Sequence, residues 1–264
     1  MNLAGARILI TGGAGGIGAA LAGEFLAAGA QLMLTDRAEA ALARTVAQFG
    51  QRPERIVAVT ADITAGDSRR ELSRRAIEWS VNVVVNNAGV NHFRLYEELT
   101  EAQIEQTVAV NVVAPMMLIH DLLPHLKLQP EAHLLNLGSV FGNIGYPAYA
   151  AYSASKFAVR GLTEALRREL ADTNVHVHYL APRATRTAIN PQAVVDMNNA
   201  LKVAMDPPET VARAARAMLE RNKPRCVIGW PEKLFARINA ILPGIVDNAI
   251  GRQLSTIRHH ARQH

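Results

Sequence analysis

The chain has 264 residues, of which 49% are hydrophobic and 19% charged, a balance typical of a globular protein rather than a disordered one. The net charge is +5, but the arginines are spread along the chain without a recognition motif, so we predict no nucleic-acid binding. The single cysteine, Cys226, excludes an internal disulfide and fits a reducing compartment.

The sequence shows no pattern typical of a metal site, a secretory signal peptide or a membrane-spanning helix. No Cys/His cluster has metal-ligand spacing, so we predict no metal site. The N-terminus lacks a charged region followed by a long apolar core, as a secretory signal would have. No uninterrupted apolar run approaches the ~18–20 residues of a spanning helix. We therefore expect a cytoplasmic protein.

The most informative stretch is residues 7–18, where a short apolar run meets a cluster of glycines. Ile8–Ile10 predict a strand, glycine fills positions 12, 13, 15, 16 and 18, and residues 19–30 favour a helix. Glycine permits a tight turn and lets the backbone approach a pyrophosphate without an obstructing Cβ. The N–H groups and dipole of the following helix suit the phosphates.

A second predicted strand, residues 31–35, ends in Asp36, where a carboxylate could hold the ribose hydroxyls of a dinucleotide. Further strands are expected at 55–60 and 81–85, closed by Ala61-Asp62-Ile63 and by Asn86-Asn87-Ala88-Gly89. Helices are expected at 37–49 and 65–79. The valine-rich run at 81–85 is apolar enough to be buried on both faces of a sheet.

The second half continues the alternation of strands and helices. A long helix starts at Thr100, runs past Asn111 and is expected to break at Pro115. Strands follow at 132–137, 175–180 and 225–229, with helices at 148–172 and 208–221, whereas 183–206 reads as polar and irregular. Seven strands alternating with helices predict one Rossmann-type α/β domain over 1–264, a doubly wound parallel sheet with helices on both faces.

Tyr152-Ser-Ala-Ser-Lys156 places a phenol and an ammonium on one face of the helix at 148–172. A nearby ammonium favours phenolate, so we expect Lys156 to lower the pKa of Tyr152 toward the working range of a base. Ser139 follows a strand end shortly before this motif.

With these motifs, nearly the whole chain resembles the short-chain dehydrogenase/reductase family. The matching residues occur in the family's order: Thr11, Gly12, Gly16, Ile17 and Gly18 in the glycine turn, Asp62 and Ile63, Asn87, Ala88 and Gly89, Asn111, Ser139, Tyr152 and Lys156. Gly15 is also assigned to cofactor binding. Spacing Gly12-xx-Gly15-xx-Gly18 also fits sugar-nucleotide epimerases. That branch needs a further substrate domain for which too few residues follow Gly229.

The resemblance implies hydride transfer between a nicotinamide cofactor and a carbonyl or alcohol carbon, with the protein positioning and protonating the substrate. Tyr152 would exchange the proton with the substrate oxygen, and Ser139 would hold that oxygen. Lys156 would also hold the nicotinamide ribose, and Asn111 would link Lys156 to solvent through water. Tyr149 competes for the catalytic role, but no lysine stands one turn after it.

The chain departs from the family after the sixth strand, where Pro182 is followed by Arg183 rather than glycine. This arginine could crowd the nicotinamide pocket, contact a phosphate or point outward. Thr187 remains where the family's threonine meets the carboxamide. For the nucleotide, Asp36 favours NAD(H) over NADP(H), whereas Arg37 beside it would suit a 2′-phosphate. We predict NAD(H).

The substrate is expected to be a small molecule, and apolar side chains in the expected lid at 183–206 would suit an apolar one. These side chains equally fit packing of the lid onto the body: Ile189, Val194, Val195, Met197, Leu201 and Met205. We also expect some positions near the motifs to line the pocket, namely His92, Phe93, Val140, Asn143 and Tyr146.

The C-terminal stretch, 230–264, combines a helical apolar stripe with basic residues and a break at Pro243-Gly244. Such a stretch can cover the substrate entrance, pack on the core or on a partner subunit, or lie on an anionic membrane. A homodimer or homotetramer is expected. Two other functions stay open: a cofactor-binding scaffold with little turnover, and a membrane-surface protein directed by its basic tail.

Overall fold

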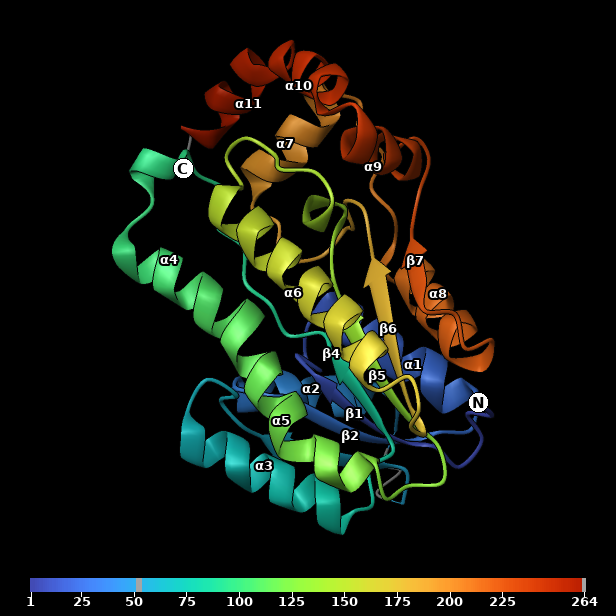
Figure 1. Ribbon diagram of the computed structural model, residues 1–264. Coiled ribbons are helices and arrows are strands. Elements are labelled where there is room, and N and C mark those ends of the chain that lie inside the picture. The colour runs from blue at the N-terminus through green and yellow to red at the C-terminus, as the bar shows by residue number, and fades with distance from the viewer. Residues whose placement is uncertain (51–53, 263–264) are drawn as a thin grey trace.

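In the computed structural model, which describes residues 1–50 and 54–262, seven parallel strands form one sheet (Figure 1). The strands are β1 (Arg7–Thr11), β2 (Gln31–Asp36), β3 (Ile56–Thr60), β4 (Val83–Asn86), β5 (Ala132–Leu137), β6 (Val175–Ala181) and β7 (Arg225–Val227). Their order is β3-β2-β1-β4-β5-β6-β7, with every neighbouring pair parallel. The predicted doubly wound, seven-stranded sheet is confirmed.

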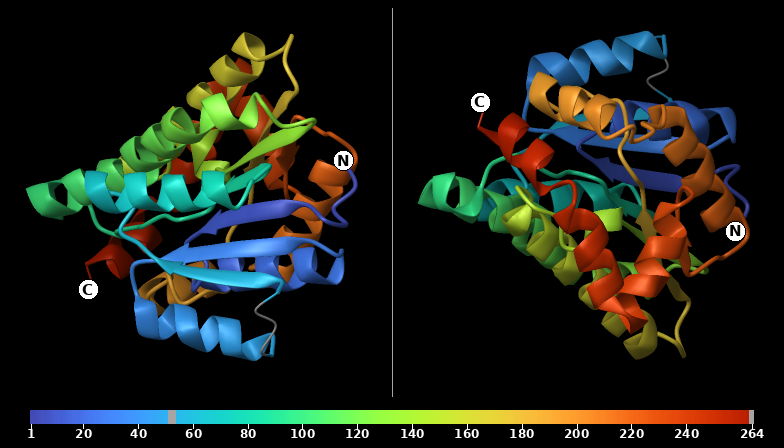
Figure 2. Two further views of the ribbon diagram at one scale, coloured as in Figure 1. Left: turned by 90° about the horizontal axis from the view of Figure 1, so that it is seen from below. Right: turned by 90° about the horizontal axis from the view of Figure 1, so that it is seen from above.

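Helices cover both faces of this sheet (Figure 2). Their bounds are α1 (Gly16–Ala27), α2 (Glu39–Gln48), α3 (Gly66–Glu78), α4 (Glu101–Val108), α5 (Ala114–Leu126), α6 (Ala150–Glu169), α7 (Gln192–Ala200), α8 (Pro208–Glu220), α9 (Glu232–Ile241), α10 (Pro243–Gly251) and α11 (Leu254–Ala261). The faces are buried because strand side chains alternate: Ile8 and Ile10 pack toward α1, α2 and α8, whereas Leu9 and Val84 pack toward α3, α5 and α6.

The strand order reverses beside β1, since β2 and β3 lie on one side and β4 to β7 on the other. In open α/β sheets, ligands bind at the carboxyl ends of the strands at such a switch point. The glycine turn after β1 and residues 87–89 after β4 lie at this edge. The topology therefore brings motifs that are far apart in sequence to one place.

Two expected irregularities fall elsewhere than predicted. The break at Pro115 is instead a π-helical segment, Ala109–Val113, directly before α5, and Pro115 occupies the first turn of that helix. Proline lacks the N–H that a continuing α-helix needs, and the wider turn before it accommodates the missing hydrogen bond. The segment 183–206 is not irregular throughout, because α7 forms within it.

The stretch Glu101–Leu126 is long and apolar enough to cross a membrane by length and composition alone. The sequence prediction found no such segment because a few polar residues interrupt its apolar run. In this structure its α5 part packs against the sheet through Leu118 and Leu122, which are fully buried. Core helices pass the same test, so this property is weak evidence for a membrane span.

Candidate active site

The turn between β1 and α1 is built from backbone that leaves no space for side chains. Gly12 has a φ of +66°, and a Cβ there would lie 2.9 Å from the Cα of Ala88. A Cβ on Gly18 would lie 2.1 Å from the carbonyl oxygen of Gly12. The turn therefore has the shape of a cradle that a Cβ would fill, as close approach of a phosphate requires.

Residues after β4 hold this turn in place. The Asn87 side chain donates from Nδ2 to the carbonyl oxygens of Thr11 and Gly12, at 3.0 and 3.1 Å. The buried Thr11 hydroxyl accepts from the backbone N–H groups of Asn87 and Ala88, at 3.1 Å each. The ends of β1 and β4 are thus fastened together at the switch point.

Two carboxylates lie at the carboxyl ends of β2 and β3. Asp36 accepts hydrogen bonds from the backbone N–H groups of Ala14 and Ala38, at 3.2 and 3.1 Å. Asp62 accepts from the hydroxyl and the backbone N–H of Thr64, at 2.6 and 2.9 Å, and these bonds hold the pKa of its carboxyl below its usual value. Both groups are therefore fixed acceptors at this edge.

A cavity of about 530 Å³ runs along the carboxyl edge of the sheet. Every residue that the sequence assigned to cofactor binding lines it: Gly12, Gly15, Gly16, Ile17, Gly18, Asp36, Arg37, Asp62, Ile63, Asn87, Ala88, Gly89, Tyr152, Lys156, Pro182 and Thr187. The residues present fit a dinucleotide, because glycine backbone forms one part of the wall and fixed carboxylates another.

Tyr152 and Lys156 lie one helical turn apart on α6, at the inner end of this cavity. The Lys156 ammonium is buried, donates to the carbonyl oxygen of Leu137 at 2.9 Å and lies 5.6 Å from the centre of the Tyr152 ring. The predicted shared face is confirmed by this arrangement.

The pKa of Tyr152 moves opposite to the sequence-based expectation. Burial raises it to about 12, and a hydrogen bond with the Ser139 side chain acts in the opposite direction. Burial also lowers the pKa of Lys156 to about 8. The pKa of Tyr152 is therefore raised and not lowered as expected, because the cost of burying a phenolate dominates.

Ser139 and Asn111 are held by backbone groups nearby. The Ser139 hydroxyl accepts from the N–H of Phe141 at 3.1 Å, at the start of the short 3₁₀ helix Val140–Gly142. Asn111, in the π-helical segment, accepts from the N–H of Val90 at 2.8 Å and donates to its carbonyl and to the Ser155 hydroxyl. Asn111 thus fastens its helix to α6, and its water relay stays a prediction.

A second cavity, of about 320 Å³, opens beside Tyr152. It meets the first cavity at residues that line both: Ile17, Gly138, Tyr152, Pro182, Thr187 and Ile189. Most of its other walls are apolar, with Phe141, Ile144, Val194, Met197, Phe235, Val246 and Ile250 among them. Tyr152 therefore stands between a dinucleotide-shaped cleft and an apolar chamber.

The expectations for the pocket wall are met in part. Val140 and Tyr146 line the second cavity, but His92, Phe93 and Asn143 do not. Phe93 is buried against the Tyr149 ring, with ring centres 5.1 Å apart. Asn143 is buried too, and its side-chain oxygen accepts from Arg160 at 3.0 Å. Proximity to a motif in sequence did not predict where these side chains point.

The alternative tyrosine is enclosed by other aromatic rings. Tyr149 is buried between Phe93 and Phe141, and burial raises the pKa of its phenol. It lines the second cavity but not the first. The geometry therefore separates Tyr149 from the dinucleotide-shaped cleft, whereas Tyr152 borders both.

The lid and the C-terminal helices close the second cavity. Ile189, Val194 and Met197 of the lid line it, whereas Val195, Leu201 and Met205 do not. Gln253, between α10 and α11, also lines the cavity and accepts from the Tyr146 hydroxyl at 3.1 Å. Sequence reasoning missed this contact because the two residues lie far apart in the chain.

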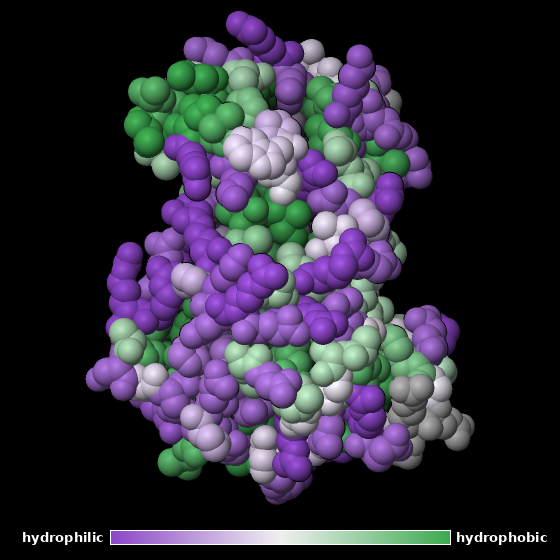
Figure 3. Space-filling model, turned by 90° about the vertical axis from the view of Figure 1, so that its right-hand side faces the viewer, coloured by the Kyte–Doolittle hydropathy of each residue, from purple (hydrophilic) through white to green (hydrophobic). Residues whose placement is uncertain are grey.

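The C-terminal stretch forms three helices, α9 to α11, up to residue 261, and the last two residues of the expected 230–264 extension lie outside the described residues. Its inner side chains face the cavity. Other apolar side chains stay exposed: Trp230, Leu234, Ile241, Leu242 and Ile245. Hydrophobic side chains gather at the level of α9 and α10 at the top of the face in Figure 3.

Arg183 does not point outward, because its side chain lines the second cavity and is only 17% exposed. Its guanidinium forms two hydrogen bonds of 2.8 Å with the Asp206 carboxylate and lies 3.4 Å from Glu232. These carboxylates hold the pKa of Arg183 above its usual value. The arginine thus ties the end of β6 to the end of the lid and to the start of α9.

The fold and the two cavities define a dinucleotide-binding α/β protein of the kind that performs oxidation and reduction. The sequence pattern of the short chain dehydrogenase family matches residues 6–198. The chain belongs to this family. The region after residue 198 lies outside the match and includes α8 to α11.

Several relatives carry the same family character. An uncharacterized oxidoreductase, YxjF of Bacillus subtilis, is 28% identical over 202 residues, covering 75% of this chain and 78% of that protein. Dehydrogenase/reductase SDR family member 7B of Xenopus tropicalis is 26% identical over 256 residues, covering 91% of this chain and 82% of that protein.

Solved structures of similar fold contain both kinds of nicotinamide nucleotide. A short-chain dehydrogenase from Sphingobium yanoikuyae in complex with NADPH has a TM-score of 0.78 at 27% identity, covering 93% of this chain and 95% of that one. A 3-ketoacyl-(acyl-carrier-protein) reductase from Brucella melitensis with NADH has a TM-score of 0.75 at 29% identity, covering 82% and 91%. These structures do not favour one nucleotide over the other.

Proposed function

We propose that this chain is an NAD(P)(H)-dependent oxidoreductase that interconverts a secondary alcohol and a ketone, or an aldehyde. The observation that carries the proposal is the position of Tyr152 where the dinucleotide-shaped cleft meets the apolar cavity. A bound nicotinamide supplies the hydride. The chain's own groups then need only position the substrate and move one proton.

Residues along the first cavity are proposed to hold the nucleotide. The turn at Gly12–Gly18 would receive the pyrophosphate, Asp36 the adenosine ribose, and Asp62 and Ile63 the adenine. The residues proposed for the nicotinamide half are Asn87, Ala88, Gly89, Lys156, Pro182 and Thr187. Lys156 is the one cation in this set, and its ammonium suits the ribose hydroxyls.

Tyr152 is proposed as the general acid and base, with Ser139 holding the substrate oxygen. A phenol with a pKa near 12 is protonated at neutral pH, so it is ready to donate a proton to a developing alkoxide. The Ser139 hydroxyl lies beside it and would donate to the same oxygen.

The second cavity supports an apolar substrate of modest size. Its volume of about 320 Å³ lies at the small end of ligand pockets. Side chains of Phe141, Met197, Phe235 and Ile250 form apolar walls. Polar side chains, Asn91, Asn190 and Gln253 among them, also line this cavity, so the proposed substrate is a largely apolar compound that carries polar groups beside the reacting oxygen.

The direct test is turnover with a panel of ketones and aldehydes, from small polar to long-chain and polycyclic, followed by NADH or NADPH absorbance. Tyr152→Phe is expected to lower kcat by about 10²–10⁴-fold while leaving nucleotide affinity, measured by fluorescence, near that of the wild type. Unchanged turnover in this variant would contradict the proposal. Tight nucleotide binding without turnover on any substrate would favour the scaffold instead.

We further propose NAD(H) as the preferred nucleotide, because the fixed Asp36 carboxylate would accept ribose hydroxyls and repel a 2′-phosphate. Arg37 lines the same cavity, and its charge acts on Asp62, helping to lower the pKa of that carboxyl. Comparing kcat/KM for NADH and NADPH tests the preference, and a strong preference for NADPH would contradict it.

Two exposed apolar faces support interaction proposals for a protein that we expect in the cytoplasm. One lies along α4, α5 and α6, where Val113, Met116, Met117 and Phe157 are exposed, and we propose it as a homodimer or homotetramer interface. Light scattering would give the mass of the assembly and so the number of subunits.

The second exposed apolar face is the outer face of α9 and α10, where Lys233 and Arg237 accompany apolar side chains. We propose that this face makes peripheral contact with an anionic membrane.

A further inference from the structure

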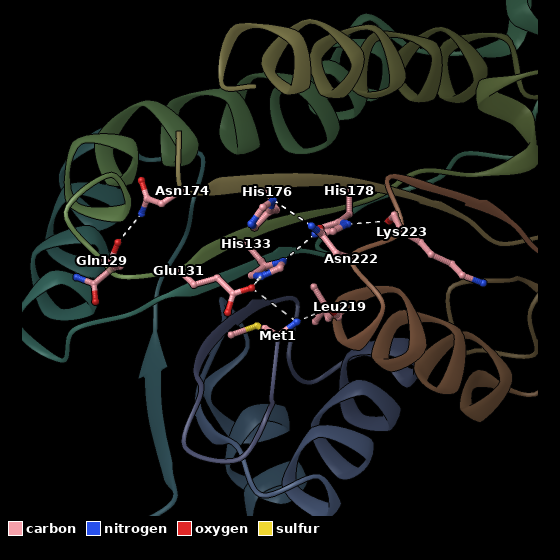
Figure 4. Close-up of polar contacts among 10 residues, drawn as sticks. All are labelled: Met1, Gln129, Glu131, His133, Asn174, His176, His178, Leu219, Asn222 and Lys223. Atoms are coloured by element: carbon pink, nitrogen blue, oxygen red, sulfur yellow. Dashed lines mark hydrogen bonds and ion pairs between the residues drawn. The ribbon is translucent and has the colours of Figure 1, made fainter. Parts of the chain in front are cut away.

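Four titratable side chains gather at the amino edge of β5 and β6, at the opposite end of the strands from the cofactor cleft. Glu131, directly before β5, lies two residues from His133, and His176 lies two residues from His178 on β6, so all four side chains face the same side of the sheet. His133 pairs in register with His176. Figure 4 shows the cluster.

A chain of hydrogen bonds determines which nitrogen of each buried ring carries the proton. The carbonyl oxygen of Lys223 can only accept, so Nδ1 of His178, 2.7 Å away, is the donor. In a neutral ring, Nε2 of His178 then accepts, and Nδ1 of His133, 2.8 Å away, donates to it. Nε2 of His133 is consequently left with a bare lone pair.

That lone pair faces a second acceptor. Oε1 of Glu131 lies 3.2 Å from Nε2 of His133, and two acceptors at this distance repel unless a cation or a proton lies between them. His133 is fully buried, which makes a positive charge on its ring costly. The α-amino group of Met1, 3.7 Å from the same Glu131 oxygen, adds one positive charge from the other side.

His176 completes a set of three ligands. One ligand atom from each of Glu131, His133 and His176 lies within 4.8 Å of the others. Around a tetrahedral Zn²⁺ with bonds of about 2.0–2.2 Å, ligand atoms are roughly 3.4 Å apart. Glu131 and His176 are partly exposed, so small side-chain movements can close the set around an ion.

The surrounding groups also orient the ligands. His178 accepts the other ring N–H of His133 and is itself fixed by Lys223. Metal-binding histidines are commonly held by such a hydrogen bond from their second nitrogen. The Asn222 amide nitrogen, 3.2 Å from Nδ1 of His176, donates to this ring atom, so His176 would bind an ion through Nδ1 once this amide moves aside. Two imidazoles with a carboxylate suit Zn²⁺, whereas Mg²⁺ and Ca²⁺ prefer oxygen ligands.

We propose that Glu131, His133 and His176 bind a divalent transition-metal ion, with Zn²⁺ the best fit and water in the fourth position. No metal-ligand spacing is visible in the sequence because the ligands come from two segments, at the starts of β5 and β6, that lie side by side only in the folded sheet. The ion would join the starts of β5 and β6 and, through His178 and Lys223, the segment between α8 and β7. It would act as a structural link away from the hydride-transfer site.

The test is calorimetric titration of the untagged, full-length, chelator-treated protein with Zn²⁺. The wild type is expected to bind one equivalent and to melt at a higher temperature with the metal. Glu131→Gln and His176→Asn should each weaken binding at least about tenfold and abolish the thermal shift. His120→Asn, an exposed histidine on α5, is the matched control and should behave as the wild type.

Circular dichroism and metal-free melting of each variant separate loss of a ligand from loss of the fold. Both substituted ligands are partly exposed, so folded variants are expected. The proposal is overturned if the wild type binds no Zn²⁺, which would leave the cluster as a proton-mediated contact. It is equally overturned if Glu131→Gln and His176→Asn bind Zn²⁺ as tightly as the wild type.

Discussion

Among single residues, Lys156 combines a positive charge with nearly complete burial. Its ammonium has the carbonyl oxygen of Leu137 as a hydrogen-bond partner at 2.9 Å and the Tyr152 ring nearby. Burial lowers the pKa of Lys156 to about 8. The residue that the nucleotide would need is thus one that weakens the folded state without it, as often happens at binding sites.

This cost predicts a pH-dependent effect of Lys156→Met on the stability of the nucleotide-free protein. Between pH 8 and 10.5 the unfolded chain binds a proton that the folded chain has lost, so wild-type stability rises with pH through this window. Methionine does not titrate, so the free energy of unfolding of the variant lacks this rise with pH. Its free energy of unfolding relative to wild type should fall by up to about 3 kcal/mol across the window.

Denaturant titrations of both proteins at pH 7, 8, 9 and 10 measure this difference. The full advantage of the variant is expected at pH 7, where Lys156 is still charged in the wild type, and the decline begins near pH 8, where about half of the Lys156 side chains have lost their proton. A difference between the two proteins that does not change with pH would show that Lys156 is not destabilised by burial.

Several single residues lie where the sequence predicts them. Gly12, Gly18, Asn87 and Tyr152 were predicted to belong to one site, and all line the same cavity, because their motifs lie at the ends of strands and topology brings those ends together. The pKa of Tyr152 was not predicted, since it depends on how deeply folding buries the phenol.

At the scale of elements, Arg183 connects three segments that close the apolar cavity. Its paired hydrogen bonds with Asp206 and its contact with Glu232 join the end of β6, the lid and α9. Both Arg183 and Asp206 are largely buried, at 17% and 14% side-chain exposure. Removing one partner of such a pair leaves the other charge unpaired.

Arg183→Met is therefore expected to lower the free energy of unfolding by about 3 kcal/mol and to raise KM for the carbonyl substrate several-fold through a looser cavity wall. Arg183→Met combined with Asp206→Asn removes both charges and should recover part of the stability. Thermal melting and steady-state kinetics measure the two effects. A single variant as stable as the wild type would show that the ion pair does not hold the lid.

Elements were predictable where local sequence determines them. The strands followed from apolar runs closed by glycine, asparagine, aspartate or proline, and α6 from its long helical pattern. The lid helix α7 was missed because its polar residues, such as Gln192 and Asp196, made the segment read as irregular. Its apolar residues are nevertheless buried at helical spacing, namely Ala193, Val194 and Met197. The π-helical turn before Pro115 was missed because composition does not report a shifted hydrogen-bond pattern.

At the scale of the whole molecule, the C-terminal helices have two apolar sides. Phe235, Val246 and Ile250 line the cavity, whereas Ile241 and Ile245 are 77% and 53% exposed. The sequence predicted an apolar stripe but not this division, which depends on how α9 and α10 meet the lid.

The outer side predicts membrane contact that can be removed without opening the cavity. Ile241→Glu combined with Ile245→Glu should abolish sedimentation with vesicles containing anionic lipid and leave kcat on a water-soluble ketone unchanged. Neutral vesicles serve as the control surface. Equal sedimentation of variant and wild type, or none by the wild type, would contradict the membrane proposal.

The central claim, hydride transfer assisted by Tyr152, is tested most directly with reduced nucleotide that carries deuterium at both C4 positions of its nicotinamide, together with a ketone that the wild type reduces. Mass spectrometry and NMR of the alcohol locate the label. We predict deuterium on the carbinol carbon with wild-type protein and no labelled alcohol above background with Tyr152→Phe. Labelled alcohol formed equally fast by that variant, or nucleotide oxidation without label in the product, would contradict the account.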